Sequence, residues 1–230
     1  MDQLVLTEKL DGQNNCFNKY GVFARSHTAT SAHPWDKPLT ERWNLVKNDL
    51  KDLEIFGENM FGIHSIAYRK LESYFYVFAV REGDRWFSWE EVKFYAEMLD
   101  FPVVPEIKIN TSMKDCFTKG ADENKVLESW LQANLGASWE ESVETPGLLG
   151  GYDPVTEKGC SEGFVIRDAS DFETNSNRLS VAENEFDSLF KLVRKAHVKT
   201  DVHWTKTWKP AQLVDYSKYN WYGYSYLSEK

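Results

Sequence analysis

The stretch from Leu4 to Gly12, LVLTEKLDG, joins a short apolar segment to a lysine and a turn. Leu4 to Thr7 is predicted to form a β-strand, because it is short, apolar and contains β-branched residues. Gly12 allows a tight turn that presents Lys9 from the end of this strand. A lysine amine is a nucleophile only without its proton, so it needs burial or nearby cations. The stretch therefore predicts a strand that presents a reactive lysine, and a surface lysine in a turn is the alternative.

The rest of the chain alternates irregularly between predicted strands and helices. Strands are predicted at 16–26, as a hairpin with Gly21 near its turn, and at 55–58, 74–81, 163–167 and 189–194. Helices are predicted from Pro38, from the capping box of Ser88 and Glu91, and over 123–135. Residues 136–161 are predicted to be a loop rich in glycine and proline. Because the strands come in hairpin-like order with helices between them, the expected fold class is α+β.

The composition restricts the class of protein. With 230 residues, the chain is expected to form one domain with a sizeable core. Aromatic residues make up 15% of the chain, which excludes disorder over its whole length. No apolar run approaches the ~20 residues that span a bilayer, and no signal peptide is visible. Three scattered cysteines favour neither a disulfide framework nor a zinc ribbon, so a cytoplasmic protein without membrane contacts is expected.

The net charge argues at first against nucleic-acid partners. Lys and Arg total 27 while Asp and Glu total 36, so the formal net charge is −9. An acidic chain is repelled by nucleic acid as a whole body. The region from Lys191 to Lys209 is an exception, because its six Lys and Arg residues face Asp201 alone and are interleaved with histidine and tryptophan. Basic groups among aromatics are typical of a polynucleotide-contacting surface, with a solvated basic helix as the alternative.

Further strings follow the lysine in a fixed order. TEKLDGQN, which begins at Thr7, is followed by FARS, FGENMFGIHSIAY, YFYVFAV, EGFVIR and FKLVRKAHVKTDVHW. The last of these strings ends at Trp204. A lysine, a glutamate, an aromatic strand, a glutamate-led strand and a cationic strand in this order resemble the covalent nucleotidyltransferase superfamily of ATP-dependent polynucleotide ligases and capping enzymes. Within it, the chain is most similar to the RNA ligase family, over roughly residues 4–208.

The resemblance implies an adenylation domain with an ATP-grasp-like α+β fold: antiparallel sheets flanked by helices, with a nucleotide cleft between the sheets. It implies that Lys9 attacks the α-phosphorus of ATP, releases pyrophosphate and holds AMP as a phosphoramide. The adenylate then moves to a polynucleotide 5′-phosphate, which a 3′-hydroxyl attacks with release of AMP. Asp11 is expected to be catalytic, and Glu8 and Glu58 to bind the nucleotide, Glu58 through the ribose hydroxyls.

The later strings supply the expected metal and phosphate ligands. Glu162 resembles the acidic residue that organises a divalent metal, Mg²⁺ or Mn²⁺, which neutralises phosphate charge. Lys191 resembles the lysine that contacts the α-phosphate of ATP. Many relatives carry a second lysine two residues later, but here that position is Val193 and the nearest other cation is Arg194. Lys191 and Arg194 are therefore both expected to be catalytic, and Lys191 to bind the nucleotide as well.

An aromatic side chain of the YFYVFAV strand is expected to stack on adenine, and Phe78 is the candidate. Simple strand alternation places Tyr76, Phe78 and Val80 on one face of this strand. Packing into the hydrophobic core is the alternative for each of them.

Contacts with phosphate and nucleic acid are expected from further arginine, lysine and histidine side chains of these strings. Arg25 resembles the arginine that grips the bound nucleotide or the substrate 5′-phosphate, since a guanidinium offers a fork of donors. The expected nucleic-acid contacts are Arg25, Lys195, His197, Lys199 and His203.

The expected organisation is a catalytic domain over 1–209 and an aromatic tail over 210–230, without a separate OB domain. The leading hypothesis is a monomeric ATP-dependent RNA ligase that acts on strands with 5′-phosphate and 3′-hydroxyl ends. The same covalent chemistry on DNA nicks, on another phosphate acceptor or in GTP-dependent capping is the second. A non-catalytic nucleotide- or RNA-binding relative is the third.

Overall fold

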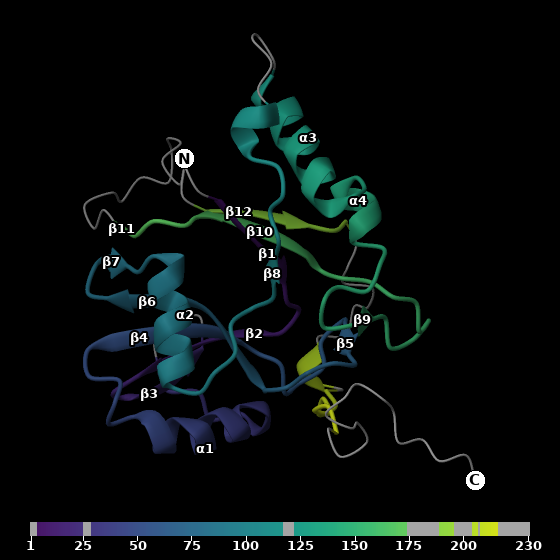
Figure 1. Ribbon diagram of the computed structural model, residues 1–230. Helices are drawn as coiled ribbons and strands as arrows, with labels where there is room; N and C mark the ends of the chain where they lie inside the picture. The colour runs from purple at the N-terminus through teal and green to yellow at the C-terminus, as the bar shows by residue number, and fades with distance from the viewer. Residues whose placement is uncertain are drawn as a thin grey trace.

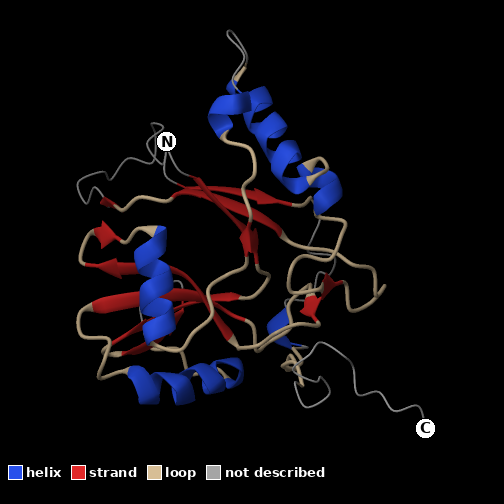
Figure 2. Cartoon of the chain, viewed as in Figure 1, coloured by secondary structure: helices blue, strands red, loops and turns tan. Residues whose placement is uncertain are grey.

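The computed structural model of the chain describes residues 4–24, 29–116, 122–173, 189–195, 204–206 and 208–215. Figures 1 and 2 show helices beside the larger sheet and further helices beyond the smaller sheet. The helices are α1 (Lys37–Val46), α2 (Trp89–Met98), α3 (Glu123–Leu135) and α4 (Trp139–Ser142). Short 3-10 turns, η1 to η3, cover Pro34–Asp36, Met113–Cys116 and Trp204–Lys206.

The smaller sheet has four strands in the order β12-β10-β1-β8. Its strands are β1 (Leu4–Lys9), β8 (Glu106–Ile107), β10 (Gly163–Asp168) and β12 (Leu189–Val193). β1 and β10 pair antiparallel from Leu4 opposite Asp168 to Lys9 opposite Gly163. Opposed residues of such a ladder share a face of the sheet, so Lys9 and Thr7 point to one face while Glu8 and Leu6 point to the other.

The larger sheet has six strands in the order β11-β7-β6-β4-β2-β3. These are β2 (Gln13–Asn18), β3 (Gly21–Ala24), β4 (Leu53–Asn59), β6 (Phe75–Glu82), β7 (Arg85–Trp86) and β11 (Phe172–Glu173). A separate pair joins β5 (Ala67–Tyr68) to β9 (Gly151–Tyr152). All of these described strand pairs are antiparallel, which confirms the expected α+β fold of antiparallel sheets flanked by helices.

Each sheet buries one apolar cluster against its helices. Leu6, Phe164 and Ile166 of the smaller sheet pack with Trp130 and Leu131 of α3. The larger cluster joins β2, β4 and β6 to α1 and α2, with fully buried side chains such as Phe17, Ile55, Val77, Val80 and Val92. The predicted capping box is present at the start of α2, where Ser88 accepts from the backbone of Glu91 and the Glu91 side chain accepts from the backbone of Ser88.

The predicted strands and helices are present, and the loop 136–161 is more structured than predicted. It contains α4 and β9, which are four and two residues long. Ser138 and Glu141 form a second capping box at α4, a signal that was available in the sequence but was missed.

Strict alternation along the YFYVFAV strand was wrong. Between Phe56 and Gly57 the register of β4 against β6 shifts by one residue, because Val77 pairs with Gly57 while Ala79 pairs with Phe56. Phe78 is therefore the extra residue of a β-bulge. Val77 and Val80 both lie fully buried in the core, so Val80 does not share the face that alternation assigned to it.

The described part of the expected C-terminal tail packs on the domain. Ala211 is buried in the larger apolar cluster, and Pro210 forms an isolated β-bridge with Gly62. Residues 216–230 lie outside the described residues, so the domain boundary at 209 and the fate of the aromatic tail stay predictions.

Two expectations from composition concern membranes and cysteines. Among the described residues, no helix is long and apolar enough to cross a membrane. Among the described residues, Cys16, Cys116 and Cys160 form no disulfide. Burial is the main cause that raises the pKa of Cys16 to about 12, so this thiol stays protonated and unreactive.

A buried arginine links the two main sheets. Arg167 of β10 is 4% exposed, and it donates to the carbonyl of Phe87 at 2.8 Å and to that of Phe78 in the bulge at 3.4 Å. Its Nε donates to the carbonyl of Asp168 at 3.1 Å. Burial lowers the pKa of Arg167 to about 10, so the guanidinium remains charged at neutral pH. Backbone carbonyls thus solvate the cation that holds the two sheets together.

The variant Arg167→Met tests this link. It leaves the buried carbonyls of Phe78 and Phe87 without their donor, so we expect the free energy of unfolding to fall by roughly 1–3 kcal/mol. Urea denaturation followed by tryptophan fluorescence measures the change. Arg85→Met is the matched control: this side chain is 41% exposed in its ion pairs, and we expect a clearly smaller change because exposed ion pairs stabilise little. Equal losses in the two variants would contradict the assignment.

Candidate active site

Lys9 stands at the end of β1 in an ion pair with Glu162. Its Nζ lies 2.5 Å from Oε2 of Glu162, and the two side chains are 24% and 7% exposed. The pair arises because Lys9 lies opposite Gly163 in the β1–β10 ladder, which places the start of β10 beside the end of β1. The candidate nucleophile and the candidate metal ligand are therefore in direct contact.

The turn after Lys9 brings Glu58 to the same place. The backbone N–H of Gly12 donates to Oε1 of Glu58 at 3.1 Å. A Cβ at position 12 would lie only 2.5 Å from the carbonyl oxygen of Asn59 and 2.9 Å from the side chain of Glu58. Glycine is therefore needed here for the close approach of two backbones, which carries Glu58 of β4 toward Lys9 of β1.

Asp11 is buried and organises the chain around the turn. Its Oδ2 accepts from the backbone N–H groups of Ser65 and Ile66, each at 2.8 Å. Its own N–H donates to the hydroxyl of Tyr68 at 2.8 Å. The carboxylate of Asp11 thus joins the turn after Lys9 to the segment that leads into β5, so its described contacts are those of a positioning group.

Burial raises the pKa values of both site glutamates. For Glu58 the pKa rises to about 8, because burial outweighs the attraction of Lys9, and the charges of Glu162 and Asp11 add to the rise. For Glu162 burial raises the pKa to about 7 against the opposing effects of Lys9 and Lys191. Burial therefore disfavours the ionised forms of both glutamates, and a bound cation would stabilise them.

Lys191 of β12 and Arg194, which directly follows this strand, are placed differently. Lys191 pairs with Val165, which pairs with Thr7, so it lies on the same face of the sheet as Lys9. It is exposed. Arg194 is 8% exposed, and its backbone N–H donates to the carbonyl of Glu162 at 2.9 Å. Among the described residues its buried Nε has no hydrogen-bond partner, so this donor is available to an anion.

Glu8 lies on the opposite face of the sheet from Lys9. It is 1% exposed, and its Oε2 accepts from the backbone N–H of Leu148 at 2.7 Å. A Cβ at Gly147 would lie within 2.5 Å of all three atoms of the Glu8 carboxylate group. Burial raises the pKa of Glu8 to about 7. The structure does not bring this side chain together with Lys9, and nucleotide binding by Glu8 stays a prediction.

The remaining predicted residues are placed in part. Phe78 is half-buried in its bulge and packs against the larger apolar cluster. Lys195 is exposed directly after Arg194. Arg25, His197, Lys199 and His203 lie outside the described residues, so their roles stay predictions.

The described donors suit a cation shared with phosphate. No group of three or more His, Cys, Asp or Glu residues in the described part of the chain is arranged to hold a metal ion. Mg²⁺ is commonly held by one or two carboxylates together with substrate phosphates and water, so such a cluster is not required. The buried carboxyl of Glu162, with Glu58 close enough for their charges to interact, fits this pattern.

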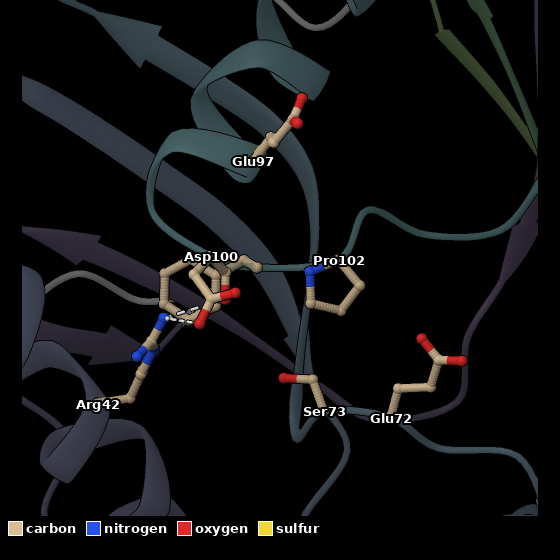
Figure 3. A pocket seen from close by; sticks show the side chains of 7 residues that line it. Arg42, Glu72, Ser73, Glu97, Asp100 and Pro102 are labelled. Carbon is tan, nitrogen blue, oxygen red and sulfur yellow. Dashed lines mark hydrogen bonds and ion pairs between the residues drawn. The ribbon is translucent and has the colours of Figure 1, made fainter. Parts of the chain in front are cut away.

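A separate hollow of about 510 Å³ lies on the helix side of the larger sheet. Figure 3 shows Arg42 beside Asp100, with which it forms an ion pair, and Glu72, Ser73, Glu97 and Pro102 as further lining residues. None of the predicted site residues lines it. This hollow is therefore distinct from the site around Lys9.

An α+β domain that holds a strand-end lysine against buried carboxylates is the arrangement expected of a nucleotidyltransferase-type ligase. The family model described as RNA ligase matches residues 2–193, and the chain belongs to this family. No curated protein sequence matches the chain.

Solved structures are similar only distantly. An archaeal ATP-dependent RNA ligase has a TM-score of 0.47 and 15% identity, covering 84% of this chain and 43% of that one. A Naegleria gruberi RNA ligase mutant with ATP and Mn has a TM-score of 0.42 and 15% identity, covering 84% and 50%. A putative ATP-dependent DNA ligase from Aquifex aeolicus has a TM-score of 0.34 and 17% identity, covering 73% and 41%. The chain spans half or less of the length of these proteins.

Two features of the site were missed from the sequence. Tyr68 accepts from the backbone of Asp11, and burial together with the charges of Asp11 and Glu8 raises its pKa well above the ordinary value. Backbone N–H groups of Ser65 and Ile66 anchor Asp11. These contacts join positions more than 50 residues apart in the chain, and no local pattern announces them.

The raised pKa of Glu8 predicts a pH-dependent stability. Between the ordinary pKa of 4.5 and about 7 the unfolded chain releases a proton that the folded chain keeps, so the free energy of unfolding falls as pH rises through this range. Glu8→Gln removes the titration. Relative to the parent, we expect this variant to gain on the order of 3 kcal/mol between pH 4.5 and 8.

Denaturation midpoints across this pH range measure the difference. Glu91→Gln is the comparison, because hydrogen bonds from Arg85 and Ser88 lower the pKa of Glu91 despite partial burial. Glu91 therefore stabilises the fold above pH 4.5 and loses this effect as pH falls, which gives the opposite slope. A pH-independent difference between Glu8→Gln and the parent would contradict the prediction.

Proposed function

We propose that the chain is an ATP-dependent RNA ligase that joins a 5′-phosphate to a 3′-hydroxyl through an adenylated Lys9. The observation that carries this proposal is the contact of Lys9 with Glu162, beside Glu58 and at the end of a sheet strand. Membership of the RNA ligase family supports it independently. A binding module would have no need for a lysine held in this way.

In the first step the amine of Lys9 forms a P–N bond to the α-phosphorus of ATP, and the bond to the pyrophosphate oxygen breaks. The attacking amine must be uncharged, so the ion pair with Glu162 describes a resting arrangement that separates before attack. Glu58 is a suitable partner for the ribose hydroxyls of the nucleotide, because a carboxyl group offers two acceptor oxygens.

In the second step the oxygen of an RNA 5′-phosphate attacks the same α-phosphorus, and the P–N bond breaks to return the amine to Lys9. In the third step a 3′-hydroxyl attacks the activated 5′-phosphate, loses its proton and releases AMP. Both steps move charge between phosphate oxygens, so they need positive charge at fixed positions. Lys191 and Arg194 of this chain are the described cations proposed to supply it.

Glu162 is the residue proposed to hold a divalent cation, Mg²⁺ or Mn²⁺. When bound, the cation would neutralise charge on the phosphate under attack. Lys9, Lys191 and Arg194 orient and bind the phosphates from the side of the smaller sheet.

Covalent labelling tests the proposed nucleophile. After incubation with α-labelled ATP and Mg²⁺, we expect label to stay on the denatured parent protein and to be absent from Lys9→Ala, because the phosphoramide needs this amine. Lys37→Ala removes an exposed lysine of α1 and serves as the control that keeps the label. Labelling of Lys9→Ala at the parent level would refute the covalent mechanism.

The acceptor is decided by a second assay. Parent protein is given 5′-phosphorylated RNA or DNA strands with 3′-hydroxyl ends, and joined products are separated by size. RNA joining supports the proposal. Joining of DNA alone, or labelling by GTP in preference to ATP, would replace it with the corresponding alternative chemistry.

Arg194 is predicted to bind phosphate without contributing to the stability of the fold. Arg194→Met removes a buried cation that has no described partner, so we expect no loss in the free energy of unfolding. The affinity for ATP should fall by roughly 10- to 100-fold, the effect of losing a charge-assisted hydrogen bond. Lys195→Met, which removes the neighbouring exposed charge, is the control and should keep its ATP affinity. Calorimetric titration with ATP measures both variants, and unchanged binding in Arg194→Met would exclude the role.

A further inference from the structure

We propose that residues 204–206 and 208–215, here called the strap, position the turn that carries Lys9, and that Trp204 and Tyr74 are positioning residues for adenylation. This inference rests on the proposed function, because the affected step is the attack by Lys9. The strap itself contributes no group to the reaction.

The strap is bound to residues 61–63 by backbone hydrogen bonds. The N–H of Ile63 donates to the carbonyl of Lys209 at 2.9 Å, and the N–H of Ala211 donates to the carbonyl of Phe61 at 2.7 Å. Between them, Gly62 and Pro210 form an antiparallel bridge. The strap therefore adds to this segment as a short strand would, although the two lie far apart in sequence.

Two further bonds fix the end of the strap. The N–H of Val214 donates to the carbonyl of Leu71 at 2.7 Å. The hydroxyl of Tyr74 donates to the carbonyl of Ala211 at 3.2 Å. Ala211 is buried in the larger apolar cluster, so this part of the strap is anchored in the core.

Aromatic rings fix the beginning of the strap. Trp204 stacks on His64 with ring centroids 3.7 Å apart, and it meets Trp35 edge-on at 4.9 Å. A Cβ at Gly62 would lie 3.1 Å from the ring of Trp204 and 3.5 Å from the Cβ of Trp35, so the backbone of Gly62 packs closely against the Trp204 ring. Trp208 contacts Trp35 and Phe61 with centroids 5.9 and 5.7 Å apart.

The segment held by the strap is the one that holds Asp11. His64 is followed directly by Ser65 and Ile66, whose N–H groups donate to the Asp11 carboxylate. Asp11 precedes Gly12, which donates to Glu58. The described contacts thus run from Trp204 through His64 and the adjacent amides to Asp11 and the turn after Lys9.

This route predicts a defect in rate with little defect in nucleotide binding. An error of about 1 Å in the position of a nucleophile can cost about 100-fold in rate. None of the strap contacts described above involves Lys191 or Arg194, the cations proposed to bind phosphate. Loss of the Trp204 ring should therefore slow the attack by Lys9 and leave the affinity for ATP nearly unchanged.

The test is the single-turnover rate of self-adenylation in the full chain. We expect Trp204→Leu to slow this rate by about 10-fold or more, and the dissociation constant of ATP to change by less than about twofold. Tyr74→Phe, which removes a single hydroxyl, should slow the rate by a smaller factor. Trp139→Leu is the matched control: Trp139 packs in the other apolar cluster, and its replacement should leave the rate unchanged.

A double-mutant cycle identifies the route. If the strap acts through Asp11, the effects of Trp204→Leu and Asp11→Asn on the rate are non-additive. Additive effects, or a parent-like rate in folded Trp204→Leu, would overturn the proposal.

Hydrogen exchange separates this inference from the proposed function. In Trp204→Leu and in the milder Tyr74→Phe, the amides of Ser65 and Ile66 should exchange faster than in the parent, whether or not the protein adenylates. Failure of the parent to become labelled would refute the covalent function and leave this readout intact. Unchanged protection of both amides in both variants would refute the strap.

Discussion

The rest of the site depends on the ladder between β1 and β10. Lys9, the last residue of β1, lies opposite Gly163, the first residue of β10. Glu162 directly precedes Gly163, so its side chain can form the ion pair with Lys9. The same ladder turns Glu8 to the opposite face, where it accepts from the backbone of Leu148, and keeps Lys9 on the face shared with Lys191. A shift of one residue in this register would exchange these faces. The position of the reactive amine is thus set by backbone hydrogen bonds.

The site contains charged side chains whose ionised forms are disfavoured by burial. Glu58 and Glu162 have raised pKa values, and Arg194 is a buried cation without a described partner. Burying such groups without partners costs free energy, and a bound cation or phosphate would offset this cost. Arg167 shows the opposite case, because three carbonyls satisfy it and it serves the fold. The formal charge of −9 therefore describes the chain as a whole and not this site.

Much of the fold followed from local sequence. The capping box of Ser88 and Glu91 begins α2 as predicted, because both partners lie within one helical turn. The bulge at Phe78 was not predicted, since it depends on how β6 pairs with β4, and the sequence of β6 alone fits regular alternation. The glycine at position 12 was predicted to form a turn, but its contact with Glu58 spans 46 residues and came only from the structure.

The sequence by itself determined the chemical identity of the site: a strand-end lysine, two glutamates and late cations in the order of the RNA ligase family. These features are local, because strand patterns and turn residues are encoded by near neighbours. The tertiary structure decided which of these groups meet and which face each occupies. It also decided that the C-terminal strap supports the segment that holds Asp11, through contacts such as that of Tyr74 with Ala211 across 137 residues. Such pairings depend on the packing of the whole chain, and no local pattern contains them.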